Sequence, residues 1–288
     1  MSRPDKAGRL PLRYHGTFTL FVPKDYETAI DQVKELNEKY GSDRLHIDTM
    51  KIFHVGVIET RTADMFDDYL DTPGNSGESL FSEAQLHDLI IDLSKEGINL
   101  RVHSVGDKST NKVLNAVERD HKTLGGPPPI RIAICHLEAV LETDFYRFKD
   151  LGVIASFTPA WHGNVGDHNV YAAIGDKAWS QMRAQPMIAD DAVVTFSSDI
   201  TTTHEWRDEA ANPGHGMQIG HNRQPVEGVP MHAMPNRAAS GSGSIRWSMA
   251  TRSTMLTSWP VGRAGVDRSG QAGRPGHPEP EPVRGESL

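Results

Sequence analysis

Four side chains that can bind a divalent cation lie at or near the ends of short apolar segments. They are Lys51, His103, His136 and Asp199. Two neutral imidazoles and a carboxylate form a suitable ligand set for zinc or a similar ion. Each of the four follows or interrupts an apolar segment. Each side chain is therefore expected to point into the opening at which these segments end, and not to solvent. The order Lys, His, His, Asp on successive segments therefore predicts a metal site.

The apolar segments alternate with amphipathic ones up to about residue 228, which is typical of repeated strand–helix units. The strands are apolar enough to be buried on both faces, as in a parallel sheet. The carboxyl ends of the strands in a parallel barrel carry the active site, because the following loops meet there. Ser82 and Gln85 have the spacing of a capping box at a helix start. Strands are predicted at 10–14 or 17–21, 50–55, 98–103, 130–136, 153–157 and 192–197. Helices are predicted at 26–39, 82–96, 110–122, 143–152 and around 177–188, the last interrupted by Pro186.

Each candidate ligand also has a purely structural interpretation. Lys51 can be a strand lysine that faces solvent, and His103 can be a histidine satisfied in the core or at the surface. Asp199 can be the N-cap of a helix that begins near Thr202. His136 follows an apolar strand and precedes Glu138, which favours a ligand.

The motifs around these residues resemble the amidohydrolase superfamily, in the family 3 branch that includes N-substituted formamide deformylases. The likeness covers residues 10 to 228 and is carried by a combination of segments. They are Lys51-Ile52-Phe53, His103-Ser104-Val105-Gly106-Asp107-Lys108, His136-Leu137-Glu138 and Phe196-Ser197-Ser198-Asp199, together with 56–59, 62–63, 73–75 and 151–156.

The resemblance implies an α/β fold, a (β/α)8 TIM-type barrel that hydrolyses carbon–nitrogen bonds of amides with one or two divalent metal ions. Lys51 would be a carbamylated bridging ligand, and His103 and His136 would be imidazole ligands. Asp199 would bind metal and take the proton from the attacking water. A divalent ion lowers the pKa of bound water towards about 7 and polarises the substrate carbonyl, so hydroxide forms at neutral pH. A nearby carboxylate can then carry the proton to the leaving amine.

Four further residues are candidates for substrate contacts. Asp107, after Gly106, could orient a ligand histidine or the substrate. Trp161, His162 and His204 are predicted to lie in loops, where they could line the substrate pocket. Trp161 could equally pack in the core or at the rim. The partner expected from this reading is a small amide-type molecule.

Two departures from the family pattern bear on activity. The family places a His-x-His pair at the end of its first strand, whereas His15 stands alone near this N-terminus. We therefore expect a chain that begins near the third strand of a partial barrel, truncated at its N-terminus. Val55 also stands where the branch usually has aspartate, which removes a polar contact near Lys51.

Composition changes near residue 228. Residues 1–228 are predicted to form the partial barrel, and residues 229–288 a low-complexity, disordered tail without lysine. Codons can be chosen for residues 249–260 such that another frame reads Gly-Tyr-Thr-Ile-Asn-Asn-Ala-Tyr-Gln-Leu-Ala, which resembles a family helix. A frame shift between about 229 and 248 is therefore the hypothesis for this tail.

Bulk properties exclude several classes of function. The formal charge is −8, from 30 basic and 38 acidic residues, which disfavours nucleic acid and anionic membranes as partners. The single cysteine, Cys135, excludes an internal disulfide framework and fits the cytoplasm. No apolar run is long enough for a membrane span. A homo-oligomer remains compatible with these properties.

The leading interpretation is a metal-dependent hydrolase of non-peptide carbon–nitrogen bonds, whose activity in this shortened chain is in doubt. One alternative is a non-catalytic gene fragment. The other is a barrel lyase that uses Lys51 as a Schiff-base nucleophile.

Overall fold

A single parallel sheet organises the protein. The computed structural model describes residues 12–164, 168–199 and 212–223. Its six strands hydrogen-bond in the order β1-β2-β3-β4-β5-β6, and every neighbouring pair is parallel. Strands that follow one another in sequence and in space are the arrangement of a parallel α/β barrel. The predicted α/β class and partial-barrel architecture are confirmed.

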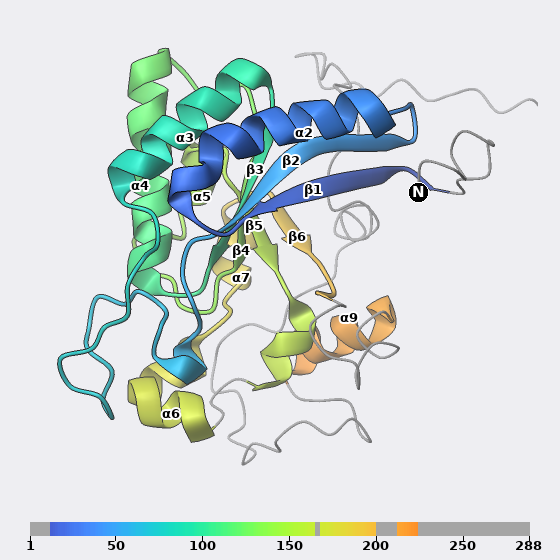
Figure 1. The fold of residues 1–288 in the computed structure, drawn as a ribbon. Coiled ribbons are helices and arrows are strands. Elements are labelled where there is room, and N and C mark those ends of the chain that lie inside the picture. The colour runs from blue at the N-terminus through green and yellow to red at the C-terminus, as the bar shows by residue number, and fades with distance from the viewer. Residues whose placement is uncertain (1–11, 165–167, 200–211, 224–288) are drawn as a thin grey trace, which may run out of the picture.

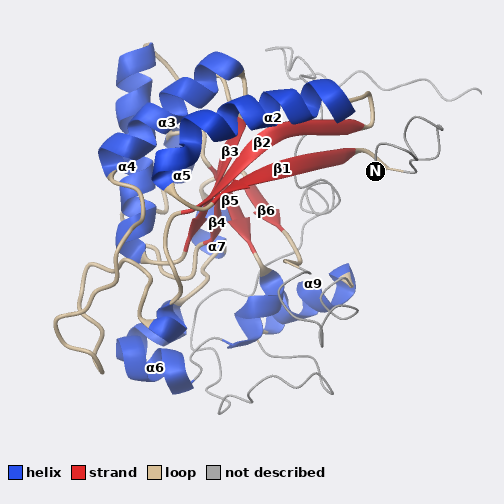
Figure 2. Ribbon diagram, viewed as in Figure 1, coloured by secondary structure: helices blue, strands red, loops and turns tan. Residues whose placement is uncertain are grey.

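The elements follow the predicted alternation of strand and helix (Figures 1 and 2). The strands are β1 Tyr14–Leu20, β2 Leu45–Phe53, β3 Asn99–Ser104, β4 Ile132–His136, β5 Ile154–Phe157 and β6 Val194–Phe196. The α-helices are α2 Tyr26–Tyr40, α3 Glu83–Glu96, α4 Asp107–Leu124, α5 Arg147–Asp150, α6 His168–Ile174, α7 Gln185–Ala189 and α9 Pro213–Asn222. Short 3-10 helices are η1 Pro23–Asp25, η2 Ile58–Thr60, η3 Pro159–Asn164 and η4 Gly175–Ser180.

The two faces of the sheet differ in chemistry. Alternate residues of β2 to β6 form an apolar core with α2, α3 and α4, which cover one face of the sheet (Figure 2). Its sheet residues include Ile52, Leu100, Val102, Ile134 and Phe157. Because successive side chains in a strand point to opposite faces, the intervening residues share the other face. That face carries mainly polar side chains: Thr49, Lys51, Asn99, Arg101, His103, Cys135, Ser156 and Thr195.

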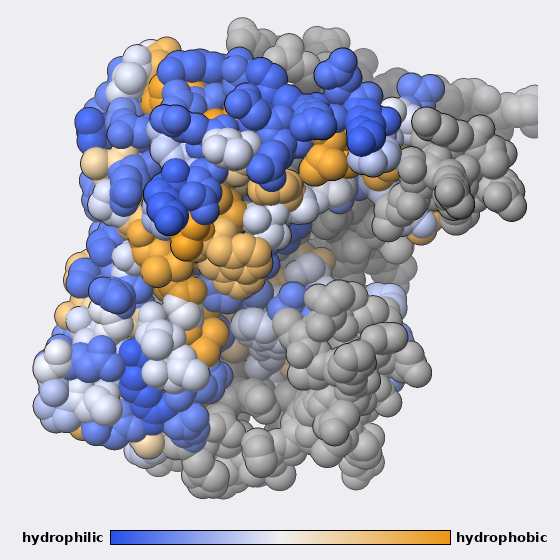
Figure 3. All heavy atoms as spheres, viewed as in Figure 1, coloured by the Kyte–Doolittle hydropathy of each residue, from blue (hydrophilic) through white to orange (hydrophobic). Residues whose placement is uncertain are grey.

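Apolar surface is also exposed beside the sheet. Phe21 and Val22 follow β1 and are 64% and 40% exposed. Figure 3 shows apolar surface below α2, bordered by the hydrophilic outer side of that helix. Among the described helices, none has the length and apolarity to cross a membrane.

The helix predicted at 177–188 is wrong. Residues 175–180 form η4 instead, and α7 begins only at Gln185. Two local features separate these elements. Met182 has a left-handed backbone with φ of 55°, and Pro186 lies at the start of α7, where its missing N–H removes no helical hydrogen bond. A helix through this segment would place that proline in its interior.

The helix predicted at 143–152 is much shorter than expected. The amide of Asp144 donates to Leu141 O and that of Arg147 donates to Asp144 O, which are turn bonds of three-residue spacing. Regular α-helix therefore begins only at Arg147, in α5. Helices α6 and α9 were not predicted, and the predicted disorder of residues 229–288 lies outside the described residues.

The capping box at the start of α3 is confirmed. The backbone N–H of Gln85 donates to Ser82 Oγ at 3.2 Å, and Ser82 N donates to Gln85 Oε1 at 2.9 Å. Two amide groups that the first helical turn leaves unpaired are thereby satisfied. Helix α3 contributes four buried residues to the core that it shares with the sheet: Leu86, Leu89, Ile90 and Leu93.

Replacing the capping serine should weaken the fold by a defined amount. We expect Ser82→Ala to lower the free energy of unfolding by about 1 kcal/mol, because the N-cap acceptor is lost. Ser82→Thr retains the hydroxyl and should keep most of that stability. Urea unfolding followed by circular dichroism measures both. Equal stability of the alanine and threonine variants would contradict this role of Ser82.

Candidate metal centre

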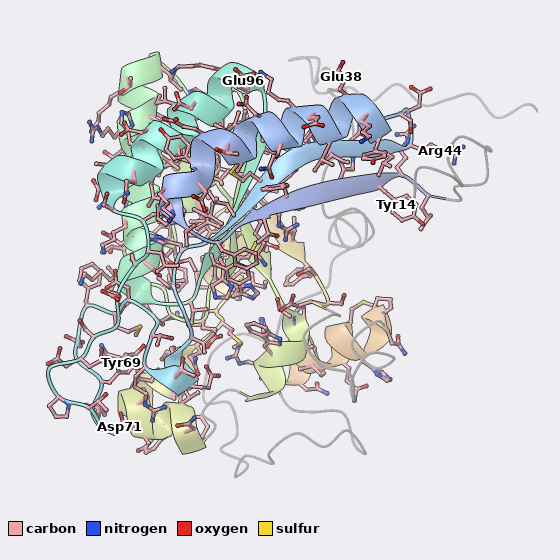
Figure 4. All side chains as sticks on the ribbon, in the orientation of Figure 1. Tyr14, Glu38, Arg44, Tyr69, Asp71 and Glu96 are labelled. Carbon is pink, nitrogen blue, oxygen red and sulfur yellow. The ribbon has the colours of Figure 1, made fainter. Side chains whose placement is uncertain are left out.

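The candidate ligands gather at the carboxyl ends of the strands. Figure 4 shows Tyr14 and Arg44 at the amino ends of β1 and β2, where Tyr14 N donates to Arg44 O at 2.7 Å. Tyr69 and Asp71 lie in the loops at the opposite end of the molecule. Lys51 lies near the end of β2, His103 near the end of β3 and His136 at the end of β4. The predicted order on successive strands therefore places them side by side.

His103 and His136 are brought together by an unusual backbone. Strand alternation would direct His136 to the helix-covered face, like Ile132 and Ile134. However, His136 and Leu137 have left-handed backbones with φ of 79° and 54°. Rotation about N–Cα moves the side chain, and the imidazole of His136 reaches that of His103 with ring centroids 4.4 Å apart. Left-handed conformations of non-glycine residues cost about 1–3 kcal/mol each and concentrate at functional sites.

Hydrogen bonds to the end of β3 and to the residue that follows it hold this turn in place. Leu137 N donates to Ser104 O at 3.1 Å, and Ala139 N donates to Val105 O at 2.9 Å. The Leu137 side chain is fully buried in the apolar core. The turn is therefore fixed from both sides, and the imidazole of His136 has little freedom to leave that of His103.

Both imidazoles are in the form that binds metal. Burial, and then the charge of Lys51, lowers the pKa of His103 to about 4. Burial, and then His103, lowers the pKa of His136 well below its usual range. Within the described residues, neither ring nitrogen of His136 nor Nδ1 of His103 has a hydrogen-bond partner. Buried polar atoms are normally paired, so these nitrogens are free to coordinate an ion.

Lys51 lies within electrostatic range of the two histidines, and Asp199 lies within range of Lys51 and Arg101. The Lys51 ammonium is 5.0 Å from the centre of the Phe53 ring, and that ring is 5.2 Å from the His103 ring. Burial raises the pKa of Asp199, and the charges of Lys51 and Arg101 partly offset the increase. Asp199 follows β6 with a left-handed backbone. The helix near Thr202 that it was alternatively expected to cap lies outside the described residues.

The residues present fit part of a metal site. His103 Nδ1 and the ring nitrogens of His136, on neutral imidazoles, are suitable donors for a divalent ion. Over the described ranges, however, no group of three or more His, Cys, Asp or Glu side chains is placed to hold one. Val55, which replaces the expected aspartate, is buried in a second apolar cluster with Ile58 and Val105. The donor set is thus a pair of histidines with Asp199 and Lys51 nearby.

The four candidate substrate residues have different surroundings. Trp161 is half-buried and stacks on His136, with ring centroids 4.5 Å apart and an angle of 12° between the planes. His162 is fully buried with its ring edge against Phe157. The carboxylate of Asp107 accepts a hydrogen bond from the backbone N–H of Phe66 at 3.0 Å and so anchors the loop after η2. These three substrate roles stay predictions, and His204 lies outside the described residues.

Two residues near the site were missed as candidates. Arg101 lies on the same face of β3 as His103, and the alternation of Asn99, Arg101 and His103 could have revealed it. Glu138 is buried, accepts a hydrogen bond from Gln181 Nε2 at 3.0 Å, and burial raises its pKa well above its usual range. No local pattern predicts the pairing of Glu138 with Gln181, because 43 residues separate them.

Comparisons with known proteins place the chain in the amidohydrolase family. The model of a family described as the amidohydrolase family matches residues 1–242. Exoenzymes regulatory protein AepA of Pectobacterium carotovorum subsp. carotovorum is 25% identical over 200 residues, which cover 69% of this chain and 42% of that protein. N-substituted formamide deformylase of Arthrobacter pascens is 28% identical over 156 residues, which cover 52% of this chain and 27% of that protein.

A solved structure supports the same fold. It is that of an uncharacterized metal-dependent hydrolase from Pyrococcus furiosus, similar with a TM-score of 0.61 and 24% sequence identity. The match covers 78% of this chain and 44% of that chain. The chain therefore spans less than half the length of each of these three relatives.

Buried histidines should make the protein sensitive to mild acid. Burial, and then the charge of Arg223, lowers the pKa of His162 to about 3, from the ordinary histidine value of about 6.5. Between these values the unfolded chain binds a proton and the folded chain does not. Stability should therefore fall as pH drops from about 6.5 towards 3, by up to about 1.4 kcal/mol per pH unit for each such histidine.

The contribution of His162 can be isolated by substitution. We expect His162→Leu to make the fall in stability between pH 6.5 and 5 shallower, as measured by urea unfolding at several pH values. His221→Gln, which removes an exposed histidine of α9, is the matched control. An unchanged slope in His162→Leu would contradict the assignment of a neutral, buried imidazole.

Proposed function

Because the chain belongs to the amidohydrolase family, we propose that it forms the catalytic part of a metal-dependent hydrolase of non-peptide carbon–nitrogen bonds. The observation that carries the proposal is the pair of buried, neutral imidazoles of His103 and His136, in which His103 Nδ1 and both ring nitrogens of His136 have no hydrogen-bond partner among the described residues. Deprotonated histidine is the form that metal ions bind. A pair held 4.4 Å apart by a left-handed turn is difficult to explain by packing alone.

The residues of this chain then have separate tasks. His103 and His136 would hold a divalent ion, which we propose is zinc, with Asp199 and carbamylated Lys51 as the further ligands. Such an ion supplies Lewis-acid polarisation of the amide and a water of lowered pKa. Asp199 would accept the proton of the attacking water and return it to the leaving amine. Trp161 fixes the His136 ring by stacking on it.

The family supports the proposed substrate class. The deformylase among the relatives supports a small, non-peptide amide as substrate. The single cysteine, which is free and buried, fits a cytoplasmic protein. The activity proposed here is that of the whole protein to which the matched region corresponds.

Metal removal and reloading test the proposal directly. The full chain is treated with a chelator, reloaded with zinc and assayed for release of formate from an N-alkylformamide. We expect turnover only with the ion present. His103→Gln and His136→Gln should each lower both retained zinc and turnover by at least about 100-fold, because each removes a ligand. His46→Gln, a histidine at the amino end of β2, is the control and should behave as the parent chain.

Other outcomes would contradict the proposal in distinguishable ways. Full turnover after chelation, or full activity of both glutamine variants, would exclude the site. Folded protein that retains no zinc and turns over no amide would indicate the non-catalytic fragment. Borohydride trapping of a carbonyl compound on Lys51 would instead indicate the Schiff-base lyase.

A further inference from the structure

Arg101 is a second cationic side chain, after Lys51, beside the histidine pair. Arg101 is on β3, two residues before His103, and its side chain therefore leaves the same face of the sheet. In the register of the sheet, Arg101 lies opposite Lys51 on β2, and His103 lies opposite Cys135 on β4. The backbone of Arg101 is thus one layer below the histidine in the barrel mouth.

The guanidinium group extends upward into the histidine layer. Its Nη2 lies 3.4 Å from Cys135 Sγ and 3.4 Å from Ser156 Oγ. Cys135 and Ser156 are neighbours in the register of β4 and β5, at the level of His103. The positive charge of Arg101, a residue of β3, therefore lies at the level of His103, beside side chains of β4 and β5.

Cys135 and Ser156, the two partners of this guanidinium, are uncharged, and both contacts are long for hydrogen bonds. A guanidinium has five N–H donors and stays charged at any ordinary pH. In the part of the chain that the structure describes, no carboxylate forms an ion pair with Arg101 or Lys51. Donors of a half-buried cation that have only weak neutral partners are available to an anionic ligand.

The charge balance around the site favours the same conclusion. Arg101 and Lys51 both act electrostatically on His136 and on the carboxylate of Asp199. Arg101 keeps its charge even where Lys51 is carbamylated. A planar, bidentate donor of this kind matches the geometry of a carboxylate.

We propose that Arg101 binds a carboxylate group of the substrate, so that the enzyme prefers amides that carry a carboxylate a few bonds from the scissile carbon–nitrogen bond. The inference rests on the proposed function for its chemistry, but its binding step can be measured alone. One layer of a strand is about 7 Å, and the guanidinium spans it, so carboxylate and amide would lie close together. Arg101 is in this view a specificity-determining residue.

A matched pair of small amides tests the proposal. N-acetylglycine and N-acetylglycinamide have nearly the same size and differ in the negative charge. Dissociation constants are measured by NMR titration of the full chain, without any turnover. We expect N-acetylglycine to bind about tenfold more tightly, the effect of a charge-assisted hydrogen bond. Arg101→Gln should bring the ratio near one. Arg119→Gln, which removes an exposed arginine of α4, should leave the ratio unchanged.

A purely structural role of Arg101 predicts a different result. Loss of packing would weaken both ligands equally and would leave their ratio unchanged. Arg101→Lys keeps the charge without the planar fork, so it should retain a reduced preference, and it serves as the second variant where Arg101→Gln does not fold. A ratio near one in the parent chain, no detectable binding of N-acetylglycine, or a preference that survives in Arg101→Gln would each overturn the proposal.

Failure of the proposed function gives a separate signature. A clear preference for N-acetylglycine without hydrolysis of any amide would contradict the hydrolase and leave Arg101 as an anion site. Metal-dependent hydrolysis of a neutral amide with no charge preference would support the hydrolase and remove the role of Arg101.

Discussion

The site depends on the left-handed turn formed by His136 and Leu137 at the end of β4. Without it, strand alternation would bury His136 among the helices, on the opposite face from His103. The turn carries backbone strain of about 1–3 kcal/mol per residue. That cost is offset by the burial of Leu137 and by the hydrogen bonds of the turn to the chain after β3. A strained backbone that is held from both sides is a rigid support for a ligand.

One face of the sheet stabilises the fold, and the other face carries the candidate site. Residues such as Ile52, Leu100 and Ile134 are fully buried against α2, α3 and α4 and supply the apolar area that stabilises the fold. The opposite face holds Lys51, Arg101 and His103. Burying charged and polar side chains of this kind without hydrogen-bond or ion-pair partners costs free energy. A ligand that brings both a cation for the imidazoles and an anion for the guanidinium would satisfy this face.

Much of this organisation could be predicted from local patterns. The β/α alternation and the Ser82 capping box were readable because each depends on neighbouring residues. The clustering of Lys51, His103 and His136 followed from the rule that parallel strands end together. The length of α5 and the break at Met182 were not predictable, because turn bonds and a left-handed residue decided them. The redirected side chain of His136 and the long-range partners of Arg101 likewise depend on tertiary contacts that no spacing encodes.

X-ray diffraction from crystals of the chain grown with zinc, with anomalous data collected at the zinc edge, tests the central claim most directly. The account predicts an anomalous peak in the barrel mouth, about 2.0–2.1 Å from one ring nitrogen of His103 and one of His136. A peak bound elsewhere, or His103 and His136 rings that face apart with no ion between them, would contradict it.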